Sequence, residues 1–316
     1  MKTLAVLAGL AAAGVLCVGL VLGYGWLVAS QRLPSIAALT DYRPKIPLRI
    51  YTADHVLIGE FGEERRDVVH IAEVPRYMKQ AILAIEDARF YDHGGVDLAG
   101  IARASLAALS NGHATQGAST ITMQVARNFF LSSEKTFTRK IYEMMLAYKI
   151  EQELTKDQIL EVYMNQIYLG QRAYGFASAA RIYFGKDLRQ VTLAEAAMLA
   201  GLPKAPSAYN PVVNPARAKV RQQYILQRML ELGDITQAQY DAAVNEPLVV
   251  AKTTVQQFSV HAEYVAEMVR QAMYAQYRDE AYTRGLNVVT TIDSADQANA
   301  YRALRRGLMS YDARRG

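Results

Sequence analysis

The hydrophobic residues of the chain are distributed unevenly, and one segment near the N-terminus contains no charged residue. From Leu4 to Ala29 the sequence is uncharged and mostly apolar, with Tyr24 and Trp26 near its end. A helix of this length measures roughly 39 Å, enough to cross a hydrocarbon core of about 30 Å. Aromatic rings favour the headgroup layer of a membrane. We therefore expect residues 1–30 to form a single transmembrane anchor.

A cleaved signal peptide is the alternative interpretation of this segment. Signal peptides need an apolar stretch of only about 7–15 residues, and Val28-Ala29-Ser30 has the small residues of a cleavage site. The observed run is longer, so we favour a retained anchor with the N-terminus inside and the remaining chain outside the cytoplasm.

Beyond this run the pattern changes from extended to helical. Residues 31–74 contain several prolines, which indicates a linker, and Leu48–Phe61 alternates apolar residues around a turn, which predicts a short β-hairpin. Residues 75–250 show helical periodicity almost throughout. Residues 251–316 predict a second linker, a further helical stretch after Phe258 and one β-branched strand signal, and no closing element is evident. The fold class expected is mainly α.

Start and stop signals divide the helical region into separate helices. Pro75 opens a first helix, which we expect to continue to the pair Gly94-Gly95. Asp97 is expected to cap the start of a second helix, and Ser119 or Thr120 the start of a third. Thr155-x-x-Gln158 and Thr192-x-x-Glu195 are capping boxes. Asn214-Pro215 and Gly233 mark the start and the end of a further helix.

Composition excludes several classes of function. Hydrophobic residues make up 51% and charged residues 21% of the chain, which is typical of a globular protein. The net charge of +5 is too small to indicate a nucleic-acid partner. The one cysteine, Cys17, lies in the apolar run, and the glycine fingerprints of phosphate and dinucleotide sites are absent. We expect no organic cofactor.

Three polar stripes within the helical region have the spacing of a functional site. In the first, Glu86, Phe90 and His93 recur at i, i+4 and i+7, which places them on one face if the helix is continuous. A carboxylate beside apolar surface is suited to act as a base near neutral pH. The simpler interpretation is a Glu86-Asp87 pair exposed to water.

The second stripe contains Thr120, Gln124 and Arg127, again at i, i+4 and i+7. The preceding Gly117-Ala118-Ser119 leaves free backbone N–H groups at a helix start, which is a natural anion site. The stripe therefore predicts contacts to a negatively charged group.

The third stripe contains Arg139 and Glu143 as an i,i+4 pair with Lys140 beside them. Alone, this pattern is typical of a surface ion pair worth about 0.3–0.5 kcal/mol. The apolar stripe expected on the same helix consists of Ile141, Met144, Met145 and Tyr148.

Together the stripes indicate a lipid-linked, anionic substrate. Two glutamates and the cations Arg127, Arg139 and Lys140 are suited to a sugar hydroxyl and a diphosphate. We expect Glu86 and Glu143 to face each other across one cleft that also gathers these cations.

Five segments resemble the ordered motifs of the family 51 peptidoglycan glycosyltransferases. They are EDARFYDHGGVD, GASTITMQVARN, RKIYE, ILEVYMNQIYLG and the region ARIYFGKDLRQVTLAEAAMLAGLPKAPSAYNP. The resemblance as a whole runs from about Leu48 to beyond Gly233. The resemblance is strongest to class A penicillin-binding proteins of the 1A type. It departs from the family at Met123, where a glutamine is usual, and at Arg127, where a lysine is common.

The resemblance implies a lysozyme-like helical domain at residues 75–250 that polymerises lipid II, with inversion and release of undecaprenyl diphosphate. GLNVVTTIDSADQANAYRAL resembles the start of a transpeptidase region. We therefore expect a chain truncated before that domain and without transpeptidase activity. Implied partners are lipid II, the lipid-linked glycan, the bilayer and other cell-wall synthesis proteins. The implied location is the periplasmic side of the inner membrane.

The resemblance also implies roles for individual residues. Glu86 and Glu143 are the expected catalytic residues, with Glu86 as the general base. Glu143 orients the neighbouring cations or holds a Mg²⁺ or Mn²⁺ ion on the diphosphate. The expected substrate-binding residues are Asp87, Phe90, His93, Ser119, Thr120, Gln124, Arg127, Asn128, Arg139 and Lys140. The alternatives are a lysozyme-like enzyme that cleaves glycan and a non-catalytic cell-wall scaffold.

Overall fold

The structure is a computed structural model, and it describes residues 33–36, 39, 45–62, 64–103, 119–131, 137–251 and 258–315. The apolar run expected to form the anchor lies outside these residues, as do Gly117 and Ala118. Within the described residues, no helix is both long enough and apolar enough to cross a membrane. The chain divides into two compact units, one of Met1–Tyr42 with Arg89–Ile159 and one of Arg43–Ala88 with Leu160–Gly316.

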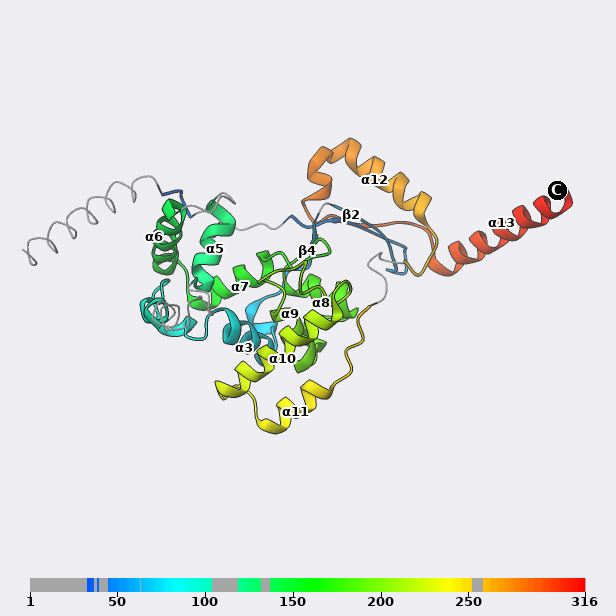
Figure 1. Cartoon of the computed structure of the whole chain (residues 1–316). Coiled ribbons are helices and arrows are strands. Elements are labelled where there is room, and N and C mark those ends of the chain that lie inside the picture. The colour runs from blue at the N-terminus through cyan, green and yellow to red at the C-terminus, as the bar shows by residue number, and fades with distance from the viewer. Residues whose placement is uncertain are drawn as a thin grey trace, which may run out of the picture. The chain divides into compact units, whose positions relative to one another are not determined.

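The first unit is built around two helices that lie side by side (Figure 1). They are α5 (Ile121–Phe130) and α6 (Phe137–Glu153), and α7 (Lys156–Gln166) begins in this unit. The short 3₁₀ helix η2 (Phe90–Asp92) precedes residues 98–103, which are also helical. As predicted, Asp97 starts that helix, because its carboxylate accepts a hydrogen bond of 2.8 Å from the Gly100 N–H.

The buried face of α6 differs from the predicted one. Leu146, Ala147 and Ile150 are fully buried, whereas Ile141 is 42% and Tyr148 is 50% exposed. Of the predicted apolar stripe, Met145 is buried and Met144 is half-buried. The prediction was therefore wrong for Ile141 and Tyr148, since packing against α5 selects a face that includes the polar residue Glu143.

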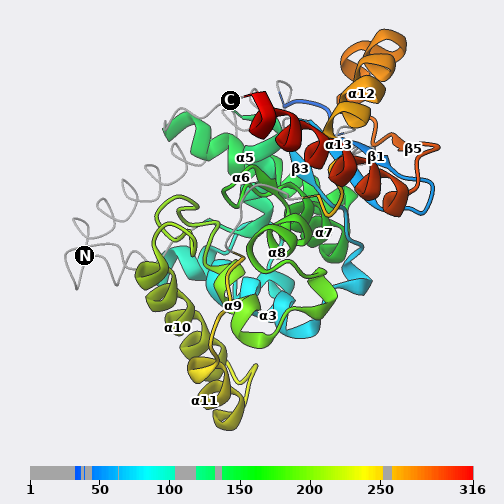
Figure 2. The same cartoon turned by 90° about the vertical axis from the view of Figure 1, so that its right-hand side faces the viewer.

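The second unit contains a helical core. Its helices are α3 (Arg76–Glu86), α8 (Phe176–Phe184), α9 (Leu193–Ala200), α10 (Pro215–Glu231) and α11 (Gln237–Asn245), with the 3₁₀ helices η1 (Ile71–Glu73) and η3 (Leu188–Gln190). Helix α9 packs against α3 and α10 and is buried after Leu193, while α10 and α11 lie side by side (Figure 2).

Local signals for these helices are confirmed. Thr192 and Glu195 form both hydrogen bonds of the predicted capping box, at 3.2 and 2.9 Å. Helix α10 begins at Pro215 after Asn214, and Gly233 follows its end with a φ of 76°.

The same unit contains a small sheet in the order β2-β1-β5. The predicted hairpin is confirmed, because β1 (Leu48–Tyr51) pairs antiparallel with β2 (Leu57–Phe61). The strand signal near the end of the sequence forms β5 (Asn287–Val289), which pairs with β1 in parallel. Two further short strands, β3 (Arg65–Arg66) and β4 (Ala173–Tyr174), also pair in parallel.

Helix α12 (Glu263–Tyr277) packs on this sheet, and the 3₁₀ helix η4 (Arg278–Tyr282) follows it. Leu48, Ile50 and Ile58 from the hairpin form a core with Ala262 and Ala266. The last element is α13 (Ser294–Arg315), a helix with no buried residue that the sequence pattern did not predict. Helices dominate the described residues, so the mainly α fold class is confirmed.

Candidate functional site

The first predicted stripe is interrupted by the end of α3. The helix ends at Glu86, and Asp87 follows with φ −161° and ψ 78°, outside the helical region. Phe90 belongs to η2, and His93 follows it in extended conformation. The prediction that Glu86, Phe90 and His93 share one helical face was therefore wrong.

Glu86 lies at the end of a well-packed helix. Met78, Ala81 and Ile82 of α3 are fully buried. Glu86 is half-buried, and Asp87 is 7% exposed. The simpler interpretation of an exposed Glu86-Asp87 pair does not describe these side chains, because one is half-buried and the other buried.

In the first unit, the start of α5 is tied to the segment that carries Phe90 and His93. Thr120 is the N-cap of α5, where its hydroxyl accepts from the Met123 N–H at 3.2 Å. The same hydroxyl donates to the Gly95 carbonyl at 2.6 Å. Phe90 is buried, and its ring meets that of His93 edge-on at a centroid distance of 6.3 Å.

The second predicted stripe lies on α5 as expected. Gln124 is 7% exposed, Arg127 is half-buried and Asn128 is exposed. The spacing therefore predicted the helix correctly.

A cluster of opposite charges lies on the first turns of α6. The ammonium of Lys140 lies 2.8 Å from Glu143 Oε2 and donates to the Ser119 hydroxyl at 2.6 Å. Arg139 Nε lies 3.2 Å from Glu143 Oε1. The Glu143 side chain is 1% exposed, so the surface-pair interpretation was wrong for this residue. Taking a carboxylate out of water is costly, and the two adjacent cations offset that cost.

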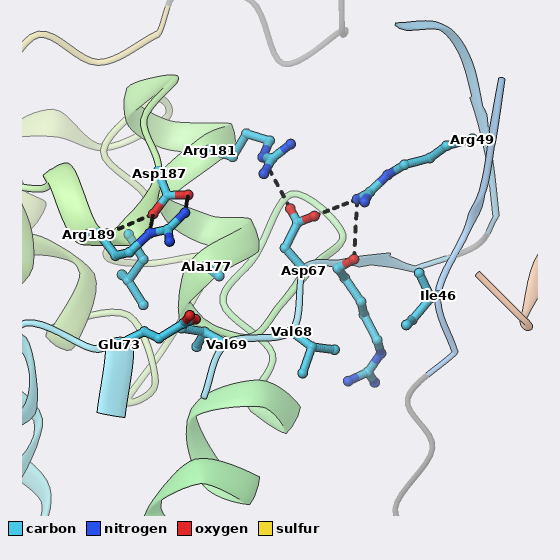
Figure 3. Close-up of a pocket in the computed structure, with 12 residues that line it drawn as sticks. Ile46, Arg49, Asp67, Val68, Val69, Glu73, Ala177, Arg181, Asp187 and Arg189 are labelled. Atoms are coloured by element: carbon cyan, nitrogen blue, oxygen red, sulfur yellow. Dashed lines mark hydrogen bonds and ion pairs between the residues drawn. The ribbon is translucent and has the colours of Figure 1, made fainter. Parts of the chain in front are cut away.

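The second unit contains a polar pocket of about 220 Å³ that sequence reasoning missed (Figure 3). Asp67 lies between two guanidinium groups, with its oxygens 2.5 Å from Arg49 and 3.2 Å from Arg181. On another wall Arg189 forms two hydrogen bonds of 2.9 Å with the Asp187 carboxylate. These residues come from separate segments of the chain, so no sequence motif predicts the pocket.

The charges of this pocket neutralise one another. The hydrogen bonds from Arg189 hold the pKa of Asp187 at about 2. Burial alone would lower the pKa of Arg49, but its contacts with Asp67 and Glu60 raise it. Since Arg49 belongs to β1 and Arg181 to α8, the network joins the hairpin to the helical core of this unit.

Comparison with known proteins identifies the family. Residues 54–230, more than half of the chain, match the family described as transglycosylase. The chain belongs to the transglycosylase family. This confirms the family resemblance and the enzyme class expected from the motifs, a peptidoglycan glycosyltransferase.

Relatives of this transglycosylase are longer proteins. It is 57% identical over 298 residues to penicillin-binding protein 1A of Neisseria lactamica. This match covers 94% of this chain and 37% of that protein. It is 49% identical over 306 residues to penicillin-binding protein 1A of Pseudomonas aeruginosa, covering 95% and 37%. The chain thus spans little more than a third of the length of these relatives.

The chain is also similar to a solved structure. The crystal structure of penicillin-binding protein 1A from Haemophilus influenzae is 36% identical with a TM-score of 0.49. The match covers 87% of the transglycosylase chain and 31% of that structure.

The predicted site residues of the transglycosylase fall in both units. Phe90, His93, Ser119, Thr120, Gln124, Arg127, Asn128, Arg139, Lys140 and Glu143 lie in the first unit, and Glu86 and Asp87 lie in the second. Direct contacts link Lys140 to Ser119 and Glu143. The prediction that Glu86 and Glu143 face each other across a cleft stays a prediction.

The surroundings of Glu143 are a poor fit for a divalent metal ion. Mg²⁺ and Mn²⁺ prefer several oxygen ligands, and both carboxylate oxygens of Glu143 already lie next to a cation. The described residues contain no group of three acidic, histidine or cysteine side chains arranged to hold a metal. A metal ion carried by the diphosphate itself stays a prediction.

Proposed function

We propose that this transglycosylase polymerises lipid II into glycan strands. The proposal depends mainly on one observation. Within the matched residues 54–230, the buried carboxylate of Glu143 lies between the cations of Arg139 and Lys140. A buried acid that aligns two cations is an arrangement suited to a diphosphate, because charge-assisted contacts of fixed geometry bind phosphate strongly.

In the proposed reaction the 4-hydroxyl of an acceptor sugar attacks the anomeric carbon of the lipid-linked donor. The new C–O bond forms as the bond to the diphosphate oxygen breaks, which inverts the α-linkage to β. Glu86 takes the proton of the attacking hydroxyl. Inversion places base and leaving group on opposite sides of the sugar ring, so two separated acids suit it better than an adjacent pair.

The leaving diphosphate gains negative charge as its bond breaks. We assign its neutralisation to Arg127, Arg139 and Lys140, because preorganised cations stabilise charge that develops in a transition state. Ser119, Thr120, Gln124 and Asn128 are assigned to polar contacts with the donor. Asp87, Phe90 and His93 are assigned to the acceptor side, where they hold the base and its loop.

We further propose that residues 1–30 anchor the enzyme in the inner membrane with its catalytic part on the periplasmic side. The uncharged run from Leu4 to Ala29 supports this location, since it is long enough to span a bilayer. A lipid-linked substrate also requires an enzyme at the membrane surface.

The proposal is tested by incubating the full chain in detergent micelles with labelled lipid II and separating the products on a gel. We expect a ladder of glycan strands that a phosphoglycolipid inhibitor of this enzyme class abolishes. A glycan-cleaving enzyme would instead release sugar from finished peptidoglycan and leave lipid II intact. A scaffold would do neither, and either result would overturn the proposal.

A further inference from the structure

A lysine outside the predicted site contacts the segment that carries Phe90 and His93. Lys156 is the first residue of α7, and its ammonium donates to the His93 carbonyl at 2.6 Å. The same ammonium lies 4.5 Å from the centre of the Phe90 ring. One side chain thus contacts both predicted substrate-binding residues of this segment, through the His93 backbone carbonyl and the face of the Phe90 ring.

The charge of Lys156 is balanced by Glu151 of α6. Their charged atoms lie 2.8 Å apart, and the side chains are 19% and 10% exposed. Glu151 also accepts a hydrogen bond of 2.6 Å from the hydroxyl of Thr122, a fully buried residue of α5. This group of three residues, Thr122, Glu151 and Lys156, therefore joins α5, α6 and α7 to the segment.

The segment itself lies against α6 at Gly95. The residue has a φ of +87°, and a Cβ there would lie 2.8 Å from the Ala147 carbonyl oxygen and 3.1 Å from Glu151 Cγ. A side chain at this position is excluded by both conformation and space. The segment is consequently held at three points: His93 by Lys156, Gly95 by α6, and the Gly95 carbonyl by Thr120.

Helix electrostatics do not account for Lys156. The first turn of a helix favours negative charge, so a lysine at the first position is unfavourable. The free backbone groups are already served by the capping box, in which Gln158 accepts from the Thr155 N–H at 2.8 Å. The ammonium of Lys156 is instead stabilised at this position by its contacts with His93, Phe90 and Glu151.

We propose that Lys156 and Glu151 are positioning residues of the transglycosylase site. They hold residues 90–95 against the start of α5, so that Phe90 and His93 stand in a fixed relation to Ser119 and Thr120, and neither touches the substrate. The kinetic part of the proposal rests on the proposed function. The structural part does not.

The decisive variant is Lys156→Met, which removes the ammonium and keeps most of the apolar stem. We expect hydrogen exchange of the backbone amides at residues 92–96 in the full chain to speed up at least about tenfold, because the carbonyl clamp is lost. We also expect kcat for lipid II polymerisation to fall about 10- to 100-fold with KM changed less than about threefold, since a small misplacement acts on the transition state.

Glu151→Gln is the milder second variant, because the amide still accepts from Thr122. It should change exchange and kcat in the same direction. The double variant should be no worse than Lys156→Met alone, as expected of groups that act as one unit. Additive losses in the double variant would contradict the proposal.

The matched control is Lys186→Met, which breaks another lysine–glutamate pair. Lys186 lies 2.7 Å from the buried Glu195 in the second unit. This variant should lower stability but leave exchange at 92–96 and kcat unchanged. The proposal fails if a folded Lys156→Met keeps wild-type exchange at 92–96, or if exchange rises equally in both variants. If the wild-type chain does not polymerise lipid II, the proposed function is wrong. The hydrogen-exchange result still tests the structural part of the proposal in that case.

Discussion

Glu143 shows how one buried charge depends on its neighbours. Its side chain is 1% exposed, and its oxygens lie 2.8 Å from Lys140 and 3.2 Å from Arg139. Those cations keep partial access to solvent, at 35% and 17%. A negative group that approaches from the solvent side would meet cations whose positions are already fixed by the acid beneath them.

Removing this acid should destabilise the fold. In Glu143→Gln both cations lose their counter-charge, and we expect the free energy of unfolding in urea to fall by about 1–3 kcal/mol. This is less than the roughly 3–5 kcal/mol for breaking a fully buried pair, because both cations reach water. The exposed Glu153 of the same helix supplies the control, and Glu153→Gln should change stability by less than about 0.5 kcal/mol. Equal losses in the two variants would show that burial of the acid does not matter.

At Glu86 the expected effect is on chemistry and not on folding. An amide cannot accept the proton of the attacking hydroxyl, so Glu86→Gln should lose at least about a hundredfold of lipid II polymerisation with an unchanged unfolding midpoint. Glu73→Gln, an exposed change in the same unit, should polymerise normally. Turnover like that of the unmodified chain would remove Glu86 from the role of base.

At the scale of elements, the contact between β2 and α12 leaves no room for a larger residue. A Cβ at Gly59 would lie 2.9 Å from Ala266 Cβ and 2.9 Å from the Phe61 ring. Distances this short force side chains or backbone to shift. The hairpin and the helix that covers it are therefore in close contact at Gly59.

We therefore expect Gly59→Ala to lower the free energy of unfolding by about 1–3 kcal/mol, the usual cost of overpacking. Gly307→Ala in α13 is the matched control, since a Cβ there meets nothing within 4 Å. Alanine favours a helix interior by about 1 kcal/mol over glycine, so helix content by circular dichroism should rise. The interpretation is wrong if both alanines act alike.

The turn of the hairpin also holds the start of α13. The Asp54 carboxylate accepts from the Ser294 hydroxyl at 2.5 Å and from its N–H at 3.1 Å. The hydroxyl bond holds the pKa of Asp54 at about 2. A lowered pKa means that the contact is fully present above the unfolded value of about 3.9 and is lost as the pH falls through 2.

The Ser294 amide signal in NMR should therefore titrate with a midpoint near pH 2, and Asp54→Asn should abolish that titration. A midpoint near the unperturbed value of about 3.9 would mean that the contact does not form in solution.

Elements set by neighbouring residues could be predicted from the sequence, and those set by distant contacts could not. The capping box at Thr192 and the hairpin at Leu48–Phe61 depend on residues a few positions apart. The end of α3 at Glu86 was missed, because periodicity continues through Phe90 and His93 although the backbone turns out of the helix at Asp87. The side of α6 that is buried depends on its packing with α5, and spacing alone does not contain that information.

The residues of the candidate site divide in the same way, into those predicted from local sequence and those that depend on distant contacts. Motif order and spacing identified the family, and the structure places Ser119 and Glu143 in contact with Lys140. Lys156 was missed because its partners, Glu151 and the carbonyl of His93, lie on other elements. The capping box beside it was the one local signal.

At the scale of the whole molecule, the exposed apolar side chains of α6 are consistent with the proposed location of the enzyme at a bilayer. Ile141 and Tyr148 are 42% and 50% exposed, and half-burying such side chains in lipid yields about 1 kcal/mol each. In a chain that starts at residue 31, the double change Ile141→Ser and Tyr148→Ser should lower liposome binding roughly 30-fold in a flotation assay, since 1.4 kcal/mol corresponds to about a factor of ten. Val220→Ser on α10, where the side chain is 68% exposed, should have no effect. An equal loss of liposome binding in Val220→Ser would indicate non-specific hydrophobic adsorption.

The parallel pairing of β1 with β5 has a consequence for the newborn chain. Tyr51 and Thr290, joined by a hydrogen bond of 2.9 Å, are 239 positions apart. At about 5–20 residues per second, a ribosome needs roughly 12–48 s to deliver the second partner after the first. Throughout that interval one side of β1 has unpaired backbone groups, which invite pairing with other chains. The early hairpin is therefore most exposed to mispairing with other chains before β5 has been made.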